Sequence, residues 1–394
     1  EKLIKDKKAV SVWSVAHGGV AEGIFKMSLG NRIGAKLDKL SDEELFTPVY
    51  GAFILELTGD ADGVKTIGET VADYAITSGD VKLDVASLEK KWDDVLEPVF
   101  KAQLPEKPAP EKIAYTGGCE LKHSSVKVAK PRVLIPVFPG TNCEYDMANA
   151  FNTYGGDSDI FVIRNLSAKD MEDSVNEFAK HIQNSQMIAI PGGFSGGDEP
   201  EGSAKFINAF FRNPKIKDAV EEMLYTRDGL MIGICNGFQA LIKLGLVPFG
   251  RIVPLTAESP TLTYNTIGRH QSQLTLTRIC TNKSPWLSCC NVGDIHNIPI
   301  SHGEGRFVAP ESVIKQLIAN GQVATQYVDL SGNPTMDVAF NPNSSMYAIE
   351  GIISPDGRVL GKMGHTERLT DNVAKNVAGN KEQLLFKGGV EYFA

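Results

Sequence analysis

The sequence predicts an α/β fold whose main domain is a mostly parallel, flavodoxin-like sheet with helices on both faces. After residue 131, short apolar runs rich in β-branched residues alternate with segments of helical spacing, which is typical of such a sheet. The chain has 394 residues, a length that favours two domains. A proline-rich, charged stretch at 104–110 separates an N-terminal α/β part from the alternating part.

We therefore expect a smaller α/β domain over 1–104, a linker or surface arm over 105–130, and the main domain over 131–394. In the small domain, the pattern predicts strands near 9–15 and 50–57 and an amphipathic helix around Trp92. In the main domain it predicts strands and helices in alternation: strands at 132–138, 159–163, 186–190 and 230–234, and helices at 147–154, 171–184, 204–212 and 237–245.

Composition narrows the class of protein. The net charge of -8 gives no basic surface for nucleic acid, and no apolar run is long enough to span a bilayer. The six cysteines lack CxxC or Cys/His metal-ligand spacing, so we assign no metal ligands and expect a reducing cytoplasm. The chain begins at Glu1 without a methionine, and we expect it to be a piece of a longer protein.

Cys235 is the strongest candidate for a reactive group. It follows the apolar run 230–234 and precedes a segment of helical spacing, so it lies at a strand-to-helix turn flanked by Gly233 and Gly237. A helix N-terminus favours negative charge, and thiolate is the reactive form of cysteine. The turn resembles a nucleophile elbow with sulfur in place of oxygen. The alternative is a small apolar side chain that fills a gap in the core.

A cysteine nucleophile needs a base, and the base needs an orienting group. His365 is the best candidate among seven histidines, because Glu367 follows it by two residues and can lie on the same side of an extended backbone. The alternative is a surface histidine beside a surface glutamate. His302 is the rival base; it precedes a glycine-flanked acidic loop, where it either orients substrate or caps a turn.

Acyl transfer also needs hydrogen-bond donors for a developing oxyanion. The backbone N–H of Asn236, directly after the cysteine, is one natural donor. The glycine loop 191–197 supplies others, because glycine lets the backbone approach a substrate closely. Phosphate binding by this loop is the weaker interpretation, since the lysine of a P-loop is missing.

Together these residues resemble the class I glutamine amidotransferases. The segment Gly233-Ile-Cys-Asn-Gly-Phe-Gln239 is similar to that family's G-x-C-x-G-x-Q elbow, and His365-Thr-Glu367 is similar to its H-x-E pair. Longer strings, at 138–146, 191–205 and 302–306, resemble the glutaminase region of phosphoribosylformylglycinamidine synthases. Residues 1–104 resemble the C-terminal half of an AIR-synthetase-type module, which is the order found in the large single-chain form of that enzyme.

The resemblance implies an enzyme that hydrolyses L-glutamine with a Cys235–His365–Glu367 triad. It implies that the N–H groups of Gly193 and Asn236 bind the oxyanion and that Gln239 contacts glutamine, with Gly192 and His302 also in the substrate site. It implies no cofactor for the glutaminase. ATP and Mg²⁺ serve the synthetase of the full enzyme, which would amidate formylglycinamide ribonucleotide with the ammonia in purine biosynthesis.

Two other functions stay open at this stage. One is another cysteine hydrolase on the same scaffold, which would need a partner other than His365. The other is a catalytically silent docking module that binds through residues 1–130.

Overall fold

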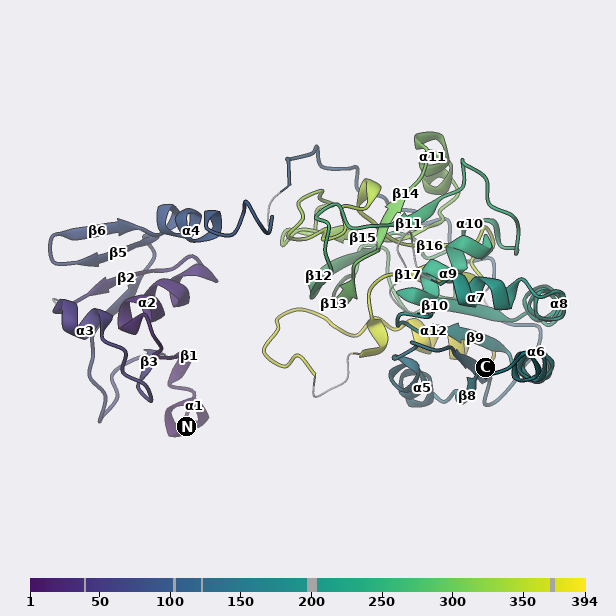
Figure 1. Ribbon diagram of the computed structural model, residues 1–394, viewed down its shortest axis with the longest axis horizontal. Coiled ribbons are helices and arrows are strands. Elements are labelled where there is room, and N and C mark those ends of the chain that lie inside the picture. Colours follow the sequence, from purple (N-terminus) through teal and green to yellow (C-terminus); the bar gives the residue numbers. More distant parts are fainter. Residues whose placement is uncertain (39, 102–103, 122, 197–203, 369–372) are drawn as a thin grey trace. The chain divides into compact units, whose positions relative to one another are not determined.

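The computed structural model describes residues 1–38, 40–101, 104–121, 123–196, 204–368 and 373–394 (Figure 1). The chain divides into two compact units, Glu1–Ala102 and Gln103–Ala394. Among the described residues, no helix is both long enough and apolar enough to cross a membrane.

The described residues of the first unit form two small sheets and four helices. Strands β1 and β3 form an antiparallel pair, and the other sheet has the order β4-β2-β5-β6, with β2 parallel to β5. Among its described residues, one small buried cluster contains Ala35, Leu37, Ile76 and Val85. The elements are α1 (Lys2–Lys5), β1 (Ala9–Ser14), α2 (Gly19–Leu29), β2 (Gly34–Leu37), α3 (Asp42–Phe46), β3 (Phe53–Leu57), β4 (Gly68–Val71), β5 (Ala75–Ser78), β6 (Val81–Asp84) and α4 (Val85–Asp94).

The second unit is built on a nine-stranded sheet with the order β13-β12-β15-β16-β17-β10-β9-β7-β8. The strands from β17 to β8 are parallel, and the four from β13 to β16 are antiparallel. These nine strands are β7 (Arg132–Val137), β8 (Asp157–Val162), β9 (Met187–Ile190), β10 (Leu230–Ile234), β12 (Gln271–Ile279), β13 (Ile295–His302), β15 (Val323–Val328), β16 (Ile349–Ile353) and β17 (Val359–Lys362); a separate pair is β11 (Thr261–Thr263) with β14 (Arg306–Val308).

Helices cover both faces of the parallel half of this sheet. In Figure 1, α7 and α9 lie on one side of β9 and β10, and α5 lies on the other. The helices are α5 (Glu144–Thr153), α6 (Ala168–Gln183), α7 (Lys205–Phe211), α8 (Pro214–Glu221), α9 (Asn236–Leu244), α10 (Leu246–Phe249), α11 (Glu311–Ala319) and α12 (Leu385–Glu391), with a π turn η1 (Glu222–Thr226) and 3-10 turns η2 (Pro285–Leu287), η3 (Met346–Ala348) and η4 (Thr366–Arg368).

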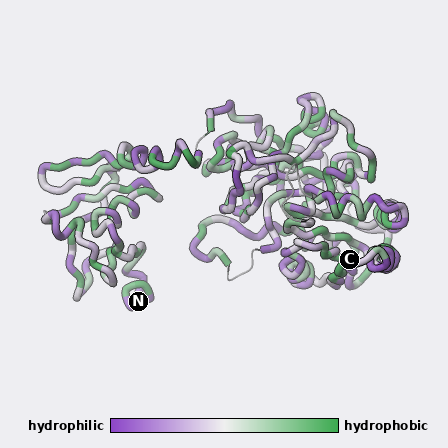
Figure 2. The backbone as a smooth tube through the Cα atoms, in the orientation of Figure 1, coloured by the Kyte–Doolittle hydropathy of each residue, from purple (hydrophilic) through white to green (hydrophobic). Residues whose placement is uncertain are grey.

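Local sequence explains why these elements form. All residues of β9 and β10 are buried, as expected for strands covered on both faces, and they form the apolar centre of the unit (Figure 2). Helix α6 begins at an N-cap, where the Ser167 side chain accepts a hydrogen bond from the Asp170 N–H. It buries Val175, Phe178 and Ile182, which recur at helical spacing on one face.

The α/β fold predicted for the main part of the chain is confirmed, and the predicted strands and helices of that part occur with shifts of a few residues at their ends. The sheet was predicted from the alternation of helices and strands, and its antiparallel strands were not part of that prediction.

The segment predicted as a linker or arm lies within the second unit. Ile113 is buried, its N–H donates to Gln326 Oε1 at 2.9 Å, and its carbonyl accepts from Arg278 at 2.7 Å. The N–H of Tyr115 donates to the Cys280 carbonyl at 2.8 Å. This part of the chain therefore packs against β12 and β15 of the large sheet.

Candidate active site

The loops that follow neighbouring parallel strands meet at one edge of the large sheet. Strands β7, β9, β10 and β17 are linked by parallel pairing, so their carboxyl ends point the same way. The residues that follow them include Cys143 after β7, Gly192 after β9, Cys235 after β10 and His365 after β17. Ligand sites of α/β sheets lie at this edge.

Cys235 occupies a strained turn between β10 and α9. Its backbone angles are φ 53° and ψ -107°, a conformation that L residues rarely adopt. Its N–H donates to the Lys362 carbonyl at 2.8 Å, which ties the turn to the end of β17. A Cβ on Gly237 would lie 2.1 Å from the Ile190 carbonyl oxygen, so only glycine allows the helix to begin this close to the sheet.

His365 and Glu367 form a buried pair beside this turn. His365 Nδ1 lies 2.6 Å from Glu367 Oε1, and the two residues are 1% and 3% exposed. Burial opposes the charge on the ring, but the Glu367 carboxylate and the Cys235 thiol more than offset it and hold the pKa of His365 well above its ordinary value. Nε2 is buried and makes no hydrogen bond within the described structure.

Gly192 shows how closely the nucleophile candidate and the base candidate approach. A Cβ built on Gly192 would lie 2.7 Å from His365 Cε1 and 3.4 Å from Cys235 Cβ. Both residues therefore border the same point, with glycine leaving the space between them open. The geometry brings the three predicted triad residues together, whereas the rival base His302 has no carboxylate partner among the described residues.

The glycine loop after β9 lies against the loop after β7. The Asn142 N–H donates to the Gly192 carbonyl at 3.2 Å, and the Phe194 N–H donates to the Gly140 carbonyl at 2.8 Å. Between these bonds Gly193 has φ +144°, and its N–H makes no hydrogen bond to any described residue. It is thus available as a hydrogen-bond donor, and its role toward an oxyanion stays a prediction. Residues 197–203, which include the end of the predicted glycine loop, lie outside the described residues.

The side chain of Asn236 connects the elbow with the glycine loop. Its Oδ1 accepts from the Ser195 N–H at 3.2 Å, and its Nδ2 donates to Gln239 Oε1 at 2.9 Å. Gln239 Nε2 in turn donates to the Glu304 carbonyl at 2.5 Å. The predicted donor residue and the predicted glutamine contact therefore belong to one hydrogen-bonded chain that runs from the glycine loop to the loop after β13.

His302 is the last residue of β13, 2% exposed, with no hydrogen bond to either ring nitrogen in the described structure. Burial, with smaller effects from His365 and His270, lowers the pKa of His302 to about 3. The ring is therefore neutral at physiological pH. Its backbone is fixed by Asn265, whose Nδ2 donates to the His302 carbonyl at 2.9 Å.

Sequence reasoning missed two residues next to the triad. Cys143 is fully buried, and its Sγ lies 3.9 Å from His365 Nδ1. Arg368 Nη2 donates to the same sulfur at 2.9 Å. The available signal was position, because Cys143 lies in the loop between the apolar run of β7 and helix α5, although not directly after the strand as Cys235 does. Among the described residues, Cys143, His365 and Glu367 are also the only three metal-ligating side chains close enough to share an ion.

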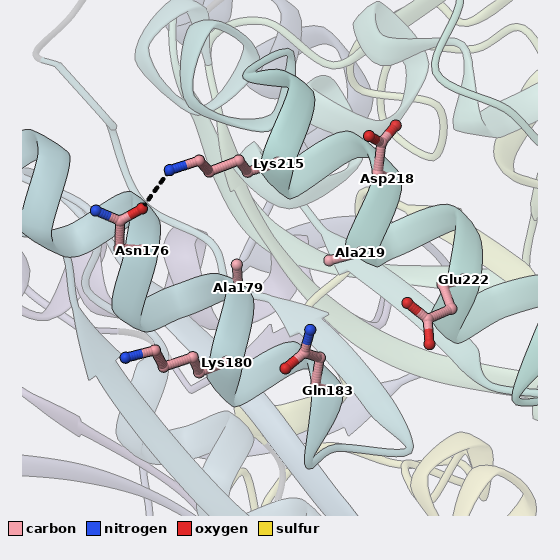
Figure 3. Close-up of a pocket in the computed structure, with 8 residues that line it drawn as sticks. All are labelled: Asn176, Ala179, Lys180, Gln183, Lys215, Asp218, Ala219 and Glu222. Carbon is pink, nitrogen blue, oxygen red and sulfur yellow. Dashed lines mark hydrogen bonds between the residues drawn. The ribbon is translucent and has the colours of Figure 1, made fainter.

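A separate surface hollow lies between α6 and α8 (Figure 3). It is polar, and Lys215 Nζ crosses it to donate to Asn176 Oδ1 at 2.7 Å. No predicted catalytic residue lines it. We therefore assign the chemistry to the sheet edge.

Comparison with known proteins identifies the family of the second unit. Residues 130–393 match the family described as CobB/CobQ-like glutamine amidotransferase domain. This chain belongs to that family. The chain is 32% identical over 287 residues to a phosphoribosylformylglycinamidine synthase subunit PurQ of Methanococcus maripaludis. The aligned residues cover 67% of this chain and 97% of that protein.

The PurQ subunit of Aquifex aeolicus is 33% identical to this glutamine amidotransferase over 237 residues, which cover 60% of this chain and 90% of that protein. Among solved structures, PurLQS from Thermotoga maritima is 25% identical with a TM-score of 0.47, and the match covers 67% of this chain and 100% of the solved chain.

Proposed function

We propose that the second unit hydrolyses L-glutamine to glutamate and ammonia with Cys235, His365 and Glu367. The observation that carries the proposal is the convergence of the strained cysteine and the buried His365–Glu367 pair around Gly192. Membership of the glutamine amidotransferase family, and relatives that carry the name PurQ, support the choice of substrate.

The first half of the reaction forms a covalent intermediate. The Cys235 thiolate attacks the side-chain amide carbon of glutamine, and the negative charge that develops on the amide oxygen is held by the N–H groups of Gly193 and Asn236. His365 carries the proton given up by the thiol and donates it to the leaving nitrogen, so that ammonia departs. A γ-glutamyl thioester then remains on the sulfur.

The second half restores the enzyme. His365 takes a proton from water as the oxygen attacks the thioester carbon, and the sulfur leaves as thiolate when glutamate is released. Glu367 keeps Nδ1 hydrogen-bonded, so that Nε2 serves both proton transfers. We assign Gly192, Gln239 and His302 to the glutamine site, where the neutral His302 ring adds no charge.

We further propose that the ammonia serves ATP-dependent conversion of formylglycinamide ribonucleotide to the amidine in purine biosynthesis. The partner is then a synthetase region that supplies ATP and Mg²⁺ chemistry, and the six free cysteines support a reducing cytoplasm as the location. In the described part of the first unit no three His, Cys, Asp or Glu side chains converge on a metal site, so no step is assigned to it.

The test is Cys235→Ala in the complete enzyme, compared with Cys289→Ala. Glutamine-dependent synthesis should disappear in the first variant while synthesis from added ammonia survives, and Cys289→Ala should retain both activities because Cys289 is a partly exposed thiol that contacts Glu391. If Cys235→Ala also abolished ammonia-dependent synthesis, the assignment of the cysteine to the glutaminase step alone would be wrong.

A further inference from the structure

A buried ion pair lies directly behind the turn that carries His365. Lys362 and Glu350 have side chains that are 1% and 0% exposed, and Lys362 Nζ lies 3.3 Å from Glu350 Oε1. Lys362 ends β17, and Glu350 lies on the neighbouring antiparallel strand β16. The predicted catalytic set includes neither residue.

Both charged groups have polar partners within the fold. Besides Glu350, the Lys362 ammonium donates to the Gly364 carbonyl at 2.7 Å and to Thr366 Oγ1 at 3.0 Å. Glu350 Oε1 accepts from the Gly364 N–H at 2.5 Å, and Oε2 accepts from the Thr325 hydroxyl. Two hydrogen bonds and one ion pair therefore compensate the buried ammonium group.

Lys362 contacts the residues directly before and after His365. Gly364 precedes His365 and Thr366 follows it, so the ammonium binds the residues on both sides of the ring's attachment point. The backbone carbonyl of the same lysine accepts the N–H of Cys235 at 2.8 Å. Lys362 thus binds the turn that carries His365 through its side chain and the turn that carries Cys235 through its backbone.

A contribution to stability does not by itself explain why Lys362 and Glu350 are buried as a charged pair. Replacing a buried ion pair by apolar residues of similar volume is often neutral or stabilising, because desolvation costs about as much as the charges gain. A fully satisfied polar network instead fixes one geometry of the groups that it touches. Here those groups are the two turns that must align for proton transfer.

We propose that Lys362 and Glu350 are positioning residues for the glutamine hydrolysis proposed above, on which this inference rests. The pair clamps residues 363–366 so that the His365 ring stays between Glu367 and Cys235. Neither charged group contacts the reacting atoms. Their loss should therefore lower kcat and leave the KM for glutamine nearly unchanged.

The first test is the double variant Lys362→Met/Glu350→Gln in the full chain. It removes both charges together, and the amide oxygen introduced in place of the Glu350 carboxylate still offers an acceptor to the Gly364 N–H. We expect kcat to fall about 10- to 100-fold, which corresponds to ~1.4–2.7 kcal/mol in the activation barrier, with KM within about twofold. The matched control is Arg358→Met/Asp228→Asn, which removes a largely buried pair at the opposite end of β17 and should keep kcat within about twofold.

A second measurement needs no glutamine. The rate of alkylation of Cys235 by iodoacetamide, measured from about pH 5 to 9 and corrected with Cys235→Ala, reports whether a histidine is aligned with the sulfur. In the double variant the rate near pH 6 should fall about tenfold, toward that of His365→Ala. A double variant with the wild-type alkylation profile would overturn the clamp. Normal alkylation of the parent without glutamate release would instead contradict the proposed function.

Thr366 provides a milder variant if the double variant does not fold. Thr366→Val removes the acceptor of the ammonium, whereas Thr366→Ser keeps it. We expect Thr366→Val to lose about tenfold in the alkylation rate near pH 6 and Thr366→Ser to retain at least about half of it. Equal rates for the two variants would overturn the proposal.

Discussion

At the scale of single residues, Gly192 sets the space available to the triad. An alanine Cβ there would lie 2.7 Å from His365 Cε1 and 3.2 Å from Cys143 Sγ, both closer than ordinary contact allows. The imidazole must shift away from Cys235, and misplacement of a reacting group costs rate. We expect Gly192→Ala to lower the kcat of glutamine hydrolysis at least about tenfold in a steady-state assay of glutamate release.

The thermal stability of Gly192→Ala distinguishes a steric effect on the His365 ring from loss of the fold. Its thermal midpoint should stay within a few degrees of wild type, because only side chains at the open edge of the sheet have to move. Unchanged kcat would show that the ring does not need its present position. That outcome would count against the triad assignment.

His302 gives a prediction about pH. The pKa of His302 is about 3 in the fold, whereas an exposed histidine titrates near about 6.5. The unfolded chain therefore binds the proton first, so this contribution to stability is complete above about pH 6.5 and is lost as the pH falls toward 3. In urea unfolding, wild type should lose about 2 kcal/mol between pH 7 and 5 relative to His302→Gln. Parallel pH curves would contradict a buried neutral ring.

At the scale of elements, the β10–α9 elbow depends on glycine more than on any side chain. A Cβ on Gly237 would lie 2.1 Å from the Ile190 carbonyl oxygen, which belongs to the backbone of a central strand and cannot move away cheaply. We expect Gly237→Ala to reduce the free energy of unfolding by about 2–3 kcal/mol in urea titrations. The control is Gly30→Ala, because a Cβ there meets no atom within 4 Å and the C-cap has helical angles. A loss for Gly30→Ala as large as that for Gly237→Ala would refute the steric explanation.

Four strands of the parallel half, β7, β8, β9 and β10, could be predicted because each is an apolar run followed by a helix; β17, which is followed by a 3-10 turn, was not predicted. Strand β12 has the sequence Gln-Ser-Gln-Leu-Thr-Leu-Thr-Arg-Ile, in which polar residues separate the apolar ones. It pairs with β13, the next strand in the chain, and with the more distant β15. Periodicity indicates such a strand, but it does not indicate which strands pair. The order of the antiparallel half was therefore not predicted, although two of its pairings, β12 with β13 and β16 with β17, join consecutive strands.

The candidate site also contains contacts that the local sequence predicts and contacts that depend on the fold. His365 and Glu367 are two residues apart, so the local sequence predicts their contact, and the elbow at Cys235 has its own glycine pattern. Cys143 reaches His365 across more than two hundred residues of chain, and only the parallel order of the strands brings it there. Cys143 was thus missed because topology alone brings it to His365, whereas Arg368 was missed although it directly follows Glu367, because its partner is Cys143.

At the scale of the whole molecule, the segment before β7 determines where the second unit begins. Burial of Ile113 and the bonds from Gln326 and Arg278 place this segment in the second unit, and further along it the Ser124 N–H donates to the Tyr392 carbonyl at 2.7 Å. Removing residues 104–130 would leave Arg278 and Gln326 without these buried partners and uncover apolar surface. Each buried polar group left unpaired costs about 1–3 kcal/mol.

Two truncations test this boundary. The chain 104–394 should unfold in urea with the midpoint shown by the second unit of the full chain, because the two units have separate cores. The chain 131–394, which begins at the boundary predicted from sequence, should lose about 3 kcal/mol or more in its free energy of unfolding, since at least two buried polar groups lose their partners. Equal midpoints for both truncations would mean that the arm adds nothing to the stability of the glutaminase unit. A lower midpoint for 104–394 than for the full chain would mean instead that the first unit stabilises the second.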